Sequence, residues 1–357
     1  MSMPRQQLST VPSVQPAQRD DAESSVKSFD TLFIAASFFG YANEIGSVLK
    51  KRGRGVMWFE DRPRIDNLTK AKIRLAPQLM ERRADSYFAD IVRQASKHPI
   101  RDVFVIKAEA VSIKSLSLMR ESFPKARFTL YFWDSYRNMP ANSSAKVDLF
   151  DRTFSFDPID VAKDSRLAYR PLFFLNEYST LASLEQDIDV LFVGTLHTDR
   201  YKVLRNIENC IPKHLSFRKI LYVRSRALLG LQGLANPGIW IHPSKADEVI
   251  YKPLGKDAMV KLVARSRTVI DIERDVQAGY TMRTLEMLGA RKKLITTNPR
   301  VSQADFYDSQ NIVVIDRKNP RIDPGFFEYP YRTPSAEIVR RYSIESWLDE
   351  LGFGHGV

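Results

Sequence analysis

The chain has 357 residues, of which 44% are apolar and 27% are charged, and this composition is typical of a folded globular protein rather than a disordered or fibrous one. A single hydrophobic core seldom grows beyond about 250 to 300 residues, so the length favours two domains with a cleft between them. The net charge of +12 predicts a surface that attracts phosphate-bearing ligands, anionic lipid or nucleic acid. Cys210 is the only cysteine, which excludes an intramolecular disulfide, a cysteine zinc cluster and a CxxC redox pair.

The chain begins with a polar segment, residues 1–28, which has no periodic apolar pattern and none of the apolar run that a signal peptide needs. We expect a disordered leader here. No run of about 18 apolar residues occurs anywhere, which predicts that the chain does not span a membrane. We therefore expect a cytoplasmic protein, and the basic charge leaves open a peripheral association with the anionic inner face of the cytoplasmic membrane.

The first half of the chain alternates short apolar runs with amphipathic segments. Residues 31–36 predict a strand, Gly40 lies in the following loop, and a helix runs through Ile45 and Leu49 to Gly53. Further strands are predicted over 56–60, 102–107 and 127–133, with a long amphipathic helix before the second of these. This alternation predicts a parallel sheet with helical crossovers.

The second half repeats the pattern, which indicates a second α/β sheet. Strands are predicted over 189–193, 217–223, 269–272, 293–297 and 311–315, and helices over 200–210, 256–264, 281–289 and 336–351. We predict a first domain over 29–175, a second over 176–335, and a closing helix and tail over 336–357. Ligands of such open sheets bind beyond the carboxyl ends of the strands, so the loops there are the candidate sites.

The clearest candidate site is the strand, loop and helix over residues 271–298. The loop ends in Gly279, and Thr281 is a good N-cap for a helix whose free amides and positive dipole end favour phosphate. Arg283 in the first turn adds a bidentate phosphate ligand, and Glu286 lies one turn further on, within reach of a ribose or sugar hydroxyl. The alternative is an ordinary capped helix with solvated charges.

A second candidate loop follows the buried strand at 189–193. Gly194 allows a ligand to approach the backbone, and the same short loop contains His197, Asp199 and Arg200. His197 could protonate a leaving phosphate, or the loop could hold only an Asp N-cap and an exposed histidine. No GxGxxG pattern and no Walker lysine occur, which argues against a dinucleotide dehydrogenase and a P-loop nucleotidase.

Three further residues are candidates for the chemistry. Lys252 could pair with a diphosphate, although most lysines are merely solvated. Asp134, at the end of a strand, or Glu44, after the first strand, could act as a general base for an incoming hydroxyl. The alternative for each acid is a structural cap or ion pair. The histidines show no metal-ligand spacing, so we predict no metal and no cofactor.

Several segments together resemble one known family. They are YFWDS at 131–135, SFDP at 155–158, RPLFF at 170–174, FVGTLHTDRYKVL at 192–204, KPL at 252–254, and QAGYTMRTLEMLGARKKLITTN at 277–298. In order and density they resemble bacterial capsule and lipopolysaccharide biosynthesis proteins, glycosyltransferases related to the CgeB-like group. The resemblance covers about residues 130 to 347.

The resemblance implies the GT-B arrangement, in which two Rossmann-like domains face a central cleft and the last helix crosses back to the first domain. The first domain would bind the acceptor, and the second would bind the nucleotide-sugar. Glu286 matches the family glutamate that contacts the donor's ribose or sugar, whereas the acid usually found eight residues earlier is replaced by Ala278. The donor-binding residues that we predict are Gly194, Thr195, Arg200, Lys252, Gln277, Gly279, Tyr280, Thr281, Arg283 and Glu286.

These observations predict a metal-independent glycosyltransferase that moves a sugar from a nucleotide-sugar to a cell-surface polysaccharide, a lipopolysaccharide or a lipid-linked glycan. Cations and the helix start at Thr281 would stabilise the leaving diphosphate, and Asp134 or Glu44 would take the acceptor proton if the reaction inverts. The alternative is a non-catalytic protein that binds a nucleotide-sugar or a polyanion in a polysaccharide assembly complex. Nucleic-acid binding is disfavoured because acids are interspersed with the basic residues and no recognised motif occurs.

Overall fold

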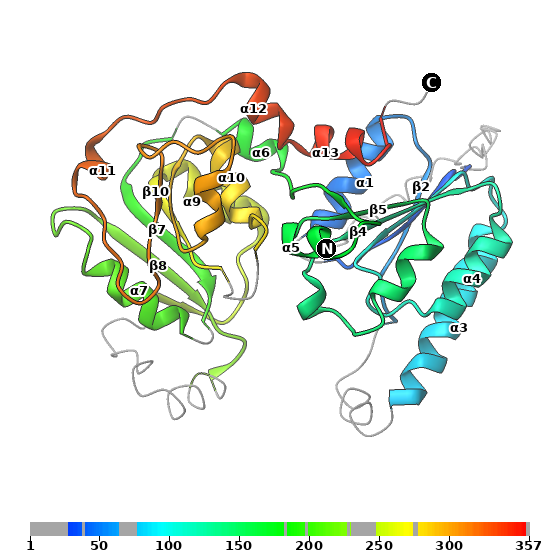
Figure 1. Ribbon diagram of the computed structural model, residues 1–357. Helices are drawn as coiled ribbons and strands as arrows, with labels where there is room; N and C mark the ends of the chain where they lie inside the picture. Colours follow the sequence, from blue (N-terminus) through cyan, green and yellow to red (C-terminus); the bar gives the residue numbers. More distant parts are fainter. Residues whose placement is uncertain are drawn as a thin grey trace, which may run out of the picture.

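The computed structural model contains two six-stranded sheets, in each of which all neighbouring strands run parallel (Figure 1). The structure describes residues 28–37, 40–63, 77–181, 184–196, 199–226, 229, 248–273 and 278–354.

The first sheet has the order β2-β1-β3-β4-β5-β6. Its strands are β1 (Thr31–Ile34), β2 (Val56–Phe59), β3 (Asp102–Ile106), β4 (Arg127–Phe132), β5 (Arg152–Ser155) and β6 (Ala168–Tyr169). The helices between them are α1 (Tyr41–Lys51), α3 (Pro77–Ala95), α4 (Ile113–Ser122) and α5 (Pro158–Lys163), and α6 (Asn176–Ser179) follows the last strand. The strand order reverses between β1 and β3, and this is where an open α/β sheet forms a crevice.

The second sheet has the order β12-β11-β10-β7-β8-β9, and its reversal lies between β7 and β10. Its strands are β7 (Ile188–Thr195), β8 (Phe217–Tyr222), β9 (Val249–Ile250), β10 (Ser266–Asp271), β11 (Lys293–Thr296) and β12 (Ile312–Val314). The helices of this half are α7 (Arg200–Glu208), α9 (Lys256–Arg265), α10 (Met282–Ala290) and α11 (Gly325–Glu328).

Central strands such as β1 and β3 are largely apolar and fully buried, as expected where helices cover both faces of a parallel sheet. In the first sheet, alternate residues belong to different cores: Phe33 and Phe104 pack with α1, whereas Leu32 and Val103 pack with α3 and α4. The second sheet divides in the same way, with Leu191 in the core that is shared by the two halves and Val190 in the core beside α7.

The closing segment consists of two helices, α12 (Ala336–Arg341) and α13 (Ile344–Glu350), rather than the single helix predicted over 336–351. The helix is interrupted because the backbone at Tyr342 and Ile344 bonds to Phe174, and Ser343 then caps α13 by accepting from the Ser346 amide. The segment crosses from the second sheet back to the first (Figure 1).

The fully buried Trp347 on α13 packs against aromatic residues of the first sheet, with ring centroids 4.8 Å from Tyr131 and 6.0 Å from Phe104. The predicted fold class is therefore confirmed, including the return of the last helix to the first domain. Within the described residues, no helix is both long enough and apolar enough to cross a membrane.

Candidate functional site

A cavity of about 700 Å³ lies between the two sheets and is lined by residues from both. The first sheet contributes Ser37, Tyr41 and Trp133, which follow β1 and β4. The second contributes the end of β7 with the start of α7, the start of α9, and the first turns of α10. Both strand-order reversals therefore open onto one cleft, which is where the topology places a ligand.

The first turns of α10 bring a charged pair into this cavity. Arg283 Nη1 lies 3.2 Å from Glu286 Oε2, and the Tyr41 hydroxyl donates to Glu286 Oε1 across the cleft at 2.8 Å. Both charged side chains, for which the sequence predicts donor binding, line the cavity. Beyond this ion pair, buried Arg283 Nη1 makes no hydrogen bond within the described residues, so it could still donate to a ligand acceptor in the cavity.

Glu286 is buried, and its surroundings alter its acidity. Burial raises the pKa of the Glu286 carboxyl, and the nearby Arg283 charge and the hydrogen bond from Tyr41 oppose that rise. Tyr178 of α6 lines the same cavity, and burial together with the Glu286 charge raises its pKa. Glu286 thus accepts hydrogen bonds from protein donors in the cleft, and it could also accept hydrogen bonds from ligand hydroxyls.

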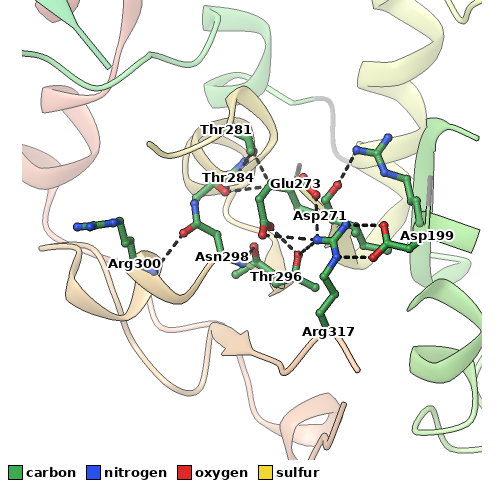
Figure 2. A network of polar contacts seen from close by, with 12 residues as sticks. Asp199, Asp271, Glu273, Thr281, Thr284, Thr296, Asn298, Arg300 and Arg317 are labelled. Carbon is green, nitrogen blue, oxygen red and sulfur yellow. Dashed lines mark hydrogen bonds and ion pairs between the residues drawn. The ribbon is translucent and has the colours of Figure 1, made fainter. Parts of the chain in front are cut away.

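The N-terminus of α10 is already capped from within the protein (Figure 2). The Thr281 hydroxyl accepts from the Thr284 amide and donates to the Asp271 carboxylate, to which Thr284 Oγ1 also donates at 3.1 Å. Thr281 is therefore an N-cap as predicted, but it does not line the cavity, and Asp271 supplies the negative charge there. The first two residues of α10, Met282 and Arg283, do line the cavity, so that the helix start holds a diphosphate stays a prediction.

The loop after β7 lies at the cavity as predicted, through Gly194, Thr195 and Arg200. Arg200 donates to the carbonyl oxygens of Thr195 at 3.0 Å and Ile272 at 2.6 Å, which orients its guanidinium beside the cavity. A Cβ on Gly194 would collide with the Phe192 ring, so this position needs glycine. The predicted His197 lies outside the described residues.

The lysine at the cavity is Lys256 rather than Lys252. Residues 253–256 line the cavity, whereas the exposed Lys252 does not, because the chain turns between β9 and the start of α9. Lys256 Nζ bonds to Glu44 Oε1 at 2.5 Å and also to Glu177. Glu44 therefore forms an ion pair on the rim of the cavity and does not line it, which matches the structural alternative for this predicted base.

Asp134, the other predicted base, follows the cavity residue Trp133 but does not itself line the cavity. Its Oδ2 lies 2.5 Å from Lys107 Nζ. Lys107 and Ala108 both have positive φ, 72° and 55°, so the backbone turns sharply at the end of β3. This turn directs the chain so that Lys107 meets Asp134 at the end of the neighbouring strand β4.

Two further predicted donor residues, Gly279 and Tyr280, do not line the cavity. Gly279 packs so closely on Phe156 of the first domain that a Cβ would overlap the Phe156 ring and carbonyl oxygen. Tyr280 stacks edge-on against Phe306, with ring centroids 5.3 Å apart, and does not line the cavity. Gln277 lies outside the described residues.

A second polar network joins the carboxyl ends of four strands of the second sheet (Figure 2). Arg317, after β12, forms a bidentate pair with Asp199 at 2.8 and 3.0 Å, and donates to the Glu273 carbonyl at 3.0 Å. The Thr297 hydroxyl donates to Glu273 Oε2 at 2.6 Å, and burial raises the pKa of the Glu273 carboxyl to about 7. These hydrogen bonds join the segments that follow β7, β10, β11 and β12.

Sequence reasoning missed several cavity residues that the fold brings together, namely Tyr41, Trp133, Tyr178 and Lys256. Tyr41 directly follows Gly40 in the loop after the first strand, and Lys256 is the first residue of a predicted helix. The position of each residue in the predicted elements could therefore have identified it as a candidate. Tyr178 had none, because the segment between the sheets gives no periodic pattern.

Comparison with solved structures identifies the class of fold. Sucrose-phosphate synthase from Thermosynechococcus elongatus matches with a TM-score of 0.56 and 10% identity, over 90% of this chain and 97% of that one. The UDP-forming alpha,alpha-trehalose-phosphate synthase from Burkholderia xenovorans, solved with glucose-6-phosphate, has a TM-score of 0.56 and 12% identity over 90% and 99%. The trehalose 6-phosphate synthase from Burkholderia multivorans has a TM-score of 0.53 and 10% identity over 91% and 96%.

The chain therefore has the GT-B fold, with two Rossmann-like domains that face a common cleft. No protein-family model matches the sequence, and no curated protein matches it either.

Proposed function

We propose that the protein is a glycosyltransferase that uses a nucleotide-sugar donor, bound in the cleft between the domains. The proposal rests on the ion pair between half-buried Arg283 and buried Glu286 at the start of α10, both of which line a cavity large enough for a small-molecule ligand. The GT-B fold and the sequence resemblance support the same assignment.

Cationic side chains in the cavity would stabilise the leaving diphosphate. Arg200, Lys256 and Arg283 line the cavity, and Glu286 is the only acid among its described lining residues. Fixed cations that face developing negative charge lower the barrier because they need no reorganisation during the reaction. In this proposal these three side chains take the electrostatic role, without a metal ion.

The other wall of the cavity suits a nucleoside. Ile250, Leu254 and Met259 line the side formed by β9 and α9, and apolar contacts of this kind bury a flat base. A donor would then extend from the apolar wall to the charged pair on α10, where Glu286 accepts hydrogen bonds from ribose or sugar hydroxyls.

The acceptor would enter from the first domain, beside Ser37 and Trp133. For an inverting reaction we propose Asp134 as the base, because it directly follows Trp133 at the cavity wall. To reach the acceptor, its carboxylate would have to turn away from Lys107 Nζ, which lies 2.5 Å from Oδ2. The acceptor oxygen would bond to the anomeric carbon as the bond from that carbon to the diphosphate breaks, and the acceptor proton would pass to Asp134. The sequence resemblance favours a cell-surface polysaccharide, a lipopolysaccharide or a lipid-linked glycan as acceptor.

The test begins with binding of UDP-, GDP- and CMP-sugars to the full chain, measured by calorimetry. Arg283→Gln should reduce kcat/KM for the active donor by about 10²- to 10³-fold, as removal of one fixed charge-stabilising group does elsewhere. Arg267→Gln is the matched control, since this exposed arginine lies on β10, outside the cavity, and loses the same charge. Equal rates for the two variants would contradict the role of Arg283.

The Asp134→Asn variant tests whether Asp134 is the catalytic base, and the wild-type chain tests whether the protein is an enzyme at all. If Asp134 is the base, the variant should bind the donor normally but transfer its sugar at least about 10²-fold more slowly. A wild-type chain that binds nucleotide-sugars but neither transfers nor hydrolyses them would instead favour the non-catalytic alternative, a nucleotide-sugar-binding component of a polysaccharide assembly complex.

A further inference from the structure

Tyr41 contacts the charged pair from the opposite domain. It is the first residue of α1, and the glycine before it has a φ of 80°, in the left-handed region that favours glycine. Gly40 and Tyr41 both line the cavity. This turn therefore directs the start of α1 into the cleft.

The Tyr41 ring is held by aromatic neighbours of its own domain. Its centroid lies 5.5 Å from that of Trp133 and 6.4 Å from that of Phe173, the latter edge-on. A ring packed in this way has little rotational freedom, so its hydroxyl has a defined position. Burial raises the pKa of the Tyr41 hydroxyl, which therefore stays protonated and able to donate.

Each of the two carboxylate oxygens of Glu286 has a partner within the protein. The Tyr41 hydroxyl donates to Oε1 at 2.8 Å, and Arg283 lies 3.2 Å from Oε2. Each carboxylate oxygen has a second acceptor site, which leaves the group able to accept from a ligand in the cavity. Arg283 belongs to the same helix as Glu286, and Tyr178 of α6 also hydrogen-bonds to Glu286, whereas Tyr41 contacts it from α1 of the first domain.

We propose that Tyr41 is a positioning residue, which fixes the orientation of the Glu286 carboxylate from the first domain so that a donor hydroxyl meets it correctly. The inference rests on the proposed function of this cleft. Glu44, one turn further along α1, also contacts the second domain, through an ion pair with Lys256. The start of α1 therefore contacts the second domain at two points.

The first experiment is a double-mutant cycle on donor affinity in the full chain, with Tyr41→Phe, Glu286→Gln and both together. Tyr41→Phe keeps the packed ring and removes only the hydroxyl, and it should raise the donor KM about tenfold with kcat changed less than about threefold. Because Tyr41 acts through Glu286, the double variant should bind no more weakly than Glu286→Gln alone. Additive losses would overturn the inference, because they would mean that Tyr41 contacts the donor independently.

The second readout is the pH dependence of donor binding. The groups that face Glu286 are Arg283 on α10, Tyr41 on α1, Tyr178 on α6 and Asp271 on β10. Removing the Tyr41 hydroxyl removes a hydrogen bond that favours the ionised carboxylate, so the acid limb of the binding profile should move up by about one pH unit. The limb should be absent in Glu286→Gln. An acid limb that stays in place in Tyr41→Phe would overturn the inference.

Tyr136→Phe is the matched control, because this tyrosine of the same domain bonds Asp164 at 3.3 Å and does not line the cavity. It should leave the KM and the pH profile unchanged. If the wild-type chain binds no nucleotide-sugar, the proposed function fails and the inference with it. If the wild type binds and Tyr41→Phe binds equally well, the inference alone fails.

Discussion

At the scale of single residues, we expect the Glu273 carboxyl to make the free energy of unfolding depend on pH. Its ordinary pKa of 4.5 is raised to about 7 by burial in the folded protein. Between these values the folded state holds a proton that the unfolded state releases, so the group favours unfolding increasingly as the pH rises through this window. A difference of this size corresponds to about 3 kcal/mol at pH 8 relative to pH 4.

Glu273→Gln should remove this dependence, since the amide mimics the neutral acid. We expect the variant to be close to the wild type at pH 5 and more stable by up to about 3 kcal/mol at pH 8. Thermal and urea unfolding at the two pH values measure the difference. A stability gap that stays constant between pH 5 and pH 8 would show that the carboxyl titrates normally in the folded protein.

At the scale of elements, two glycines should respond in opposite directions to alanine. A Cβ on Gly279 would overlap the ring and the carbonyl oxygen of Phe156, so Gly279→Ala must separate the loop before α10 from the first domain. We expect a loss of about 1 to 3 kcal/mol, as for other overpacked sites, measured by thermal unfolding.

Gly46 lies inside α1, and a Cβ there would have no atom within 4 Å. Alanine is the better helix former, so Gly46→Ala should stabilise the protein by about 0.5 to 1 kcal/mol. If both substitutions destabilised the protein equally, the close approach at Gly279 would not be the cause.

At the scale of the whole molecule, the end of the chain completes the core of its first domain. Trp347 is fully buried, and its ring centroid lies 4.6 Å from that of Phe173. Arg52 of α1 also donates to the carbonyl oxygens of Glu345 and Phe353, at 2.9 and 2.6 Å. The first domain therefore cannot form its complete core until residues 344–353 have been synthesised.

Trp347→Ala should lower the free energy of unfolding by about 3 to 5 kcal/mol, as expected for a buried large-to-small substitution, measured by urea unfolding. Glu337→Ala, at an exposed position on α12, should change stability by less than about 0.5 kcal/mol. An equally small change for Trp347→Ala would contradict the role of Trp347 in the core.

The sequence predicted the two parallel sheets because their strands are short apolar runs with interspersed helices, a pattern set by local burial. It also indicated Arg283, Glu286, Gly194 and Arg200 as donor-binding residues, and all four line the cavity, since they lie at or after the carboxyl ends of β7 and β10. That they bind a donor stays a prediction.

The sequence alone could not place Tyr41 on Glu286, residues separated by 245 positions, because their contact depends on how the domains face each other. Nor could it separate Lys252 from Lys256, since the direction of a loop residue is set by its neighbours in space. Local periodicity fixes which elements form, whereas packing between distant elements determines which side chains meet in the cavity.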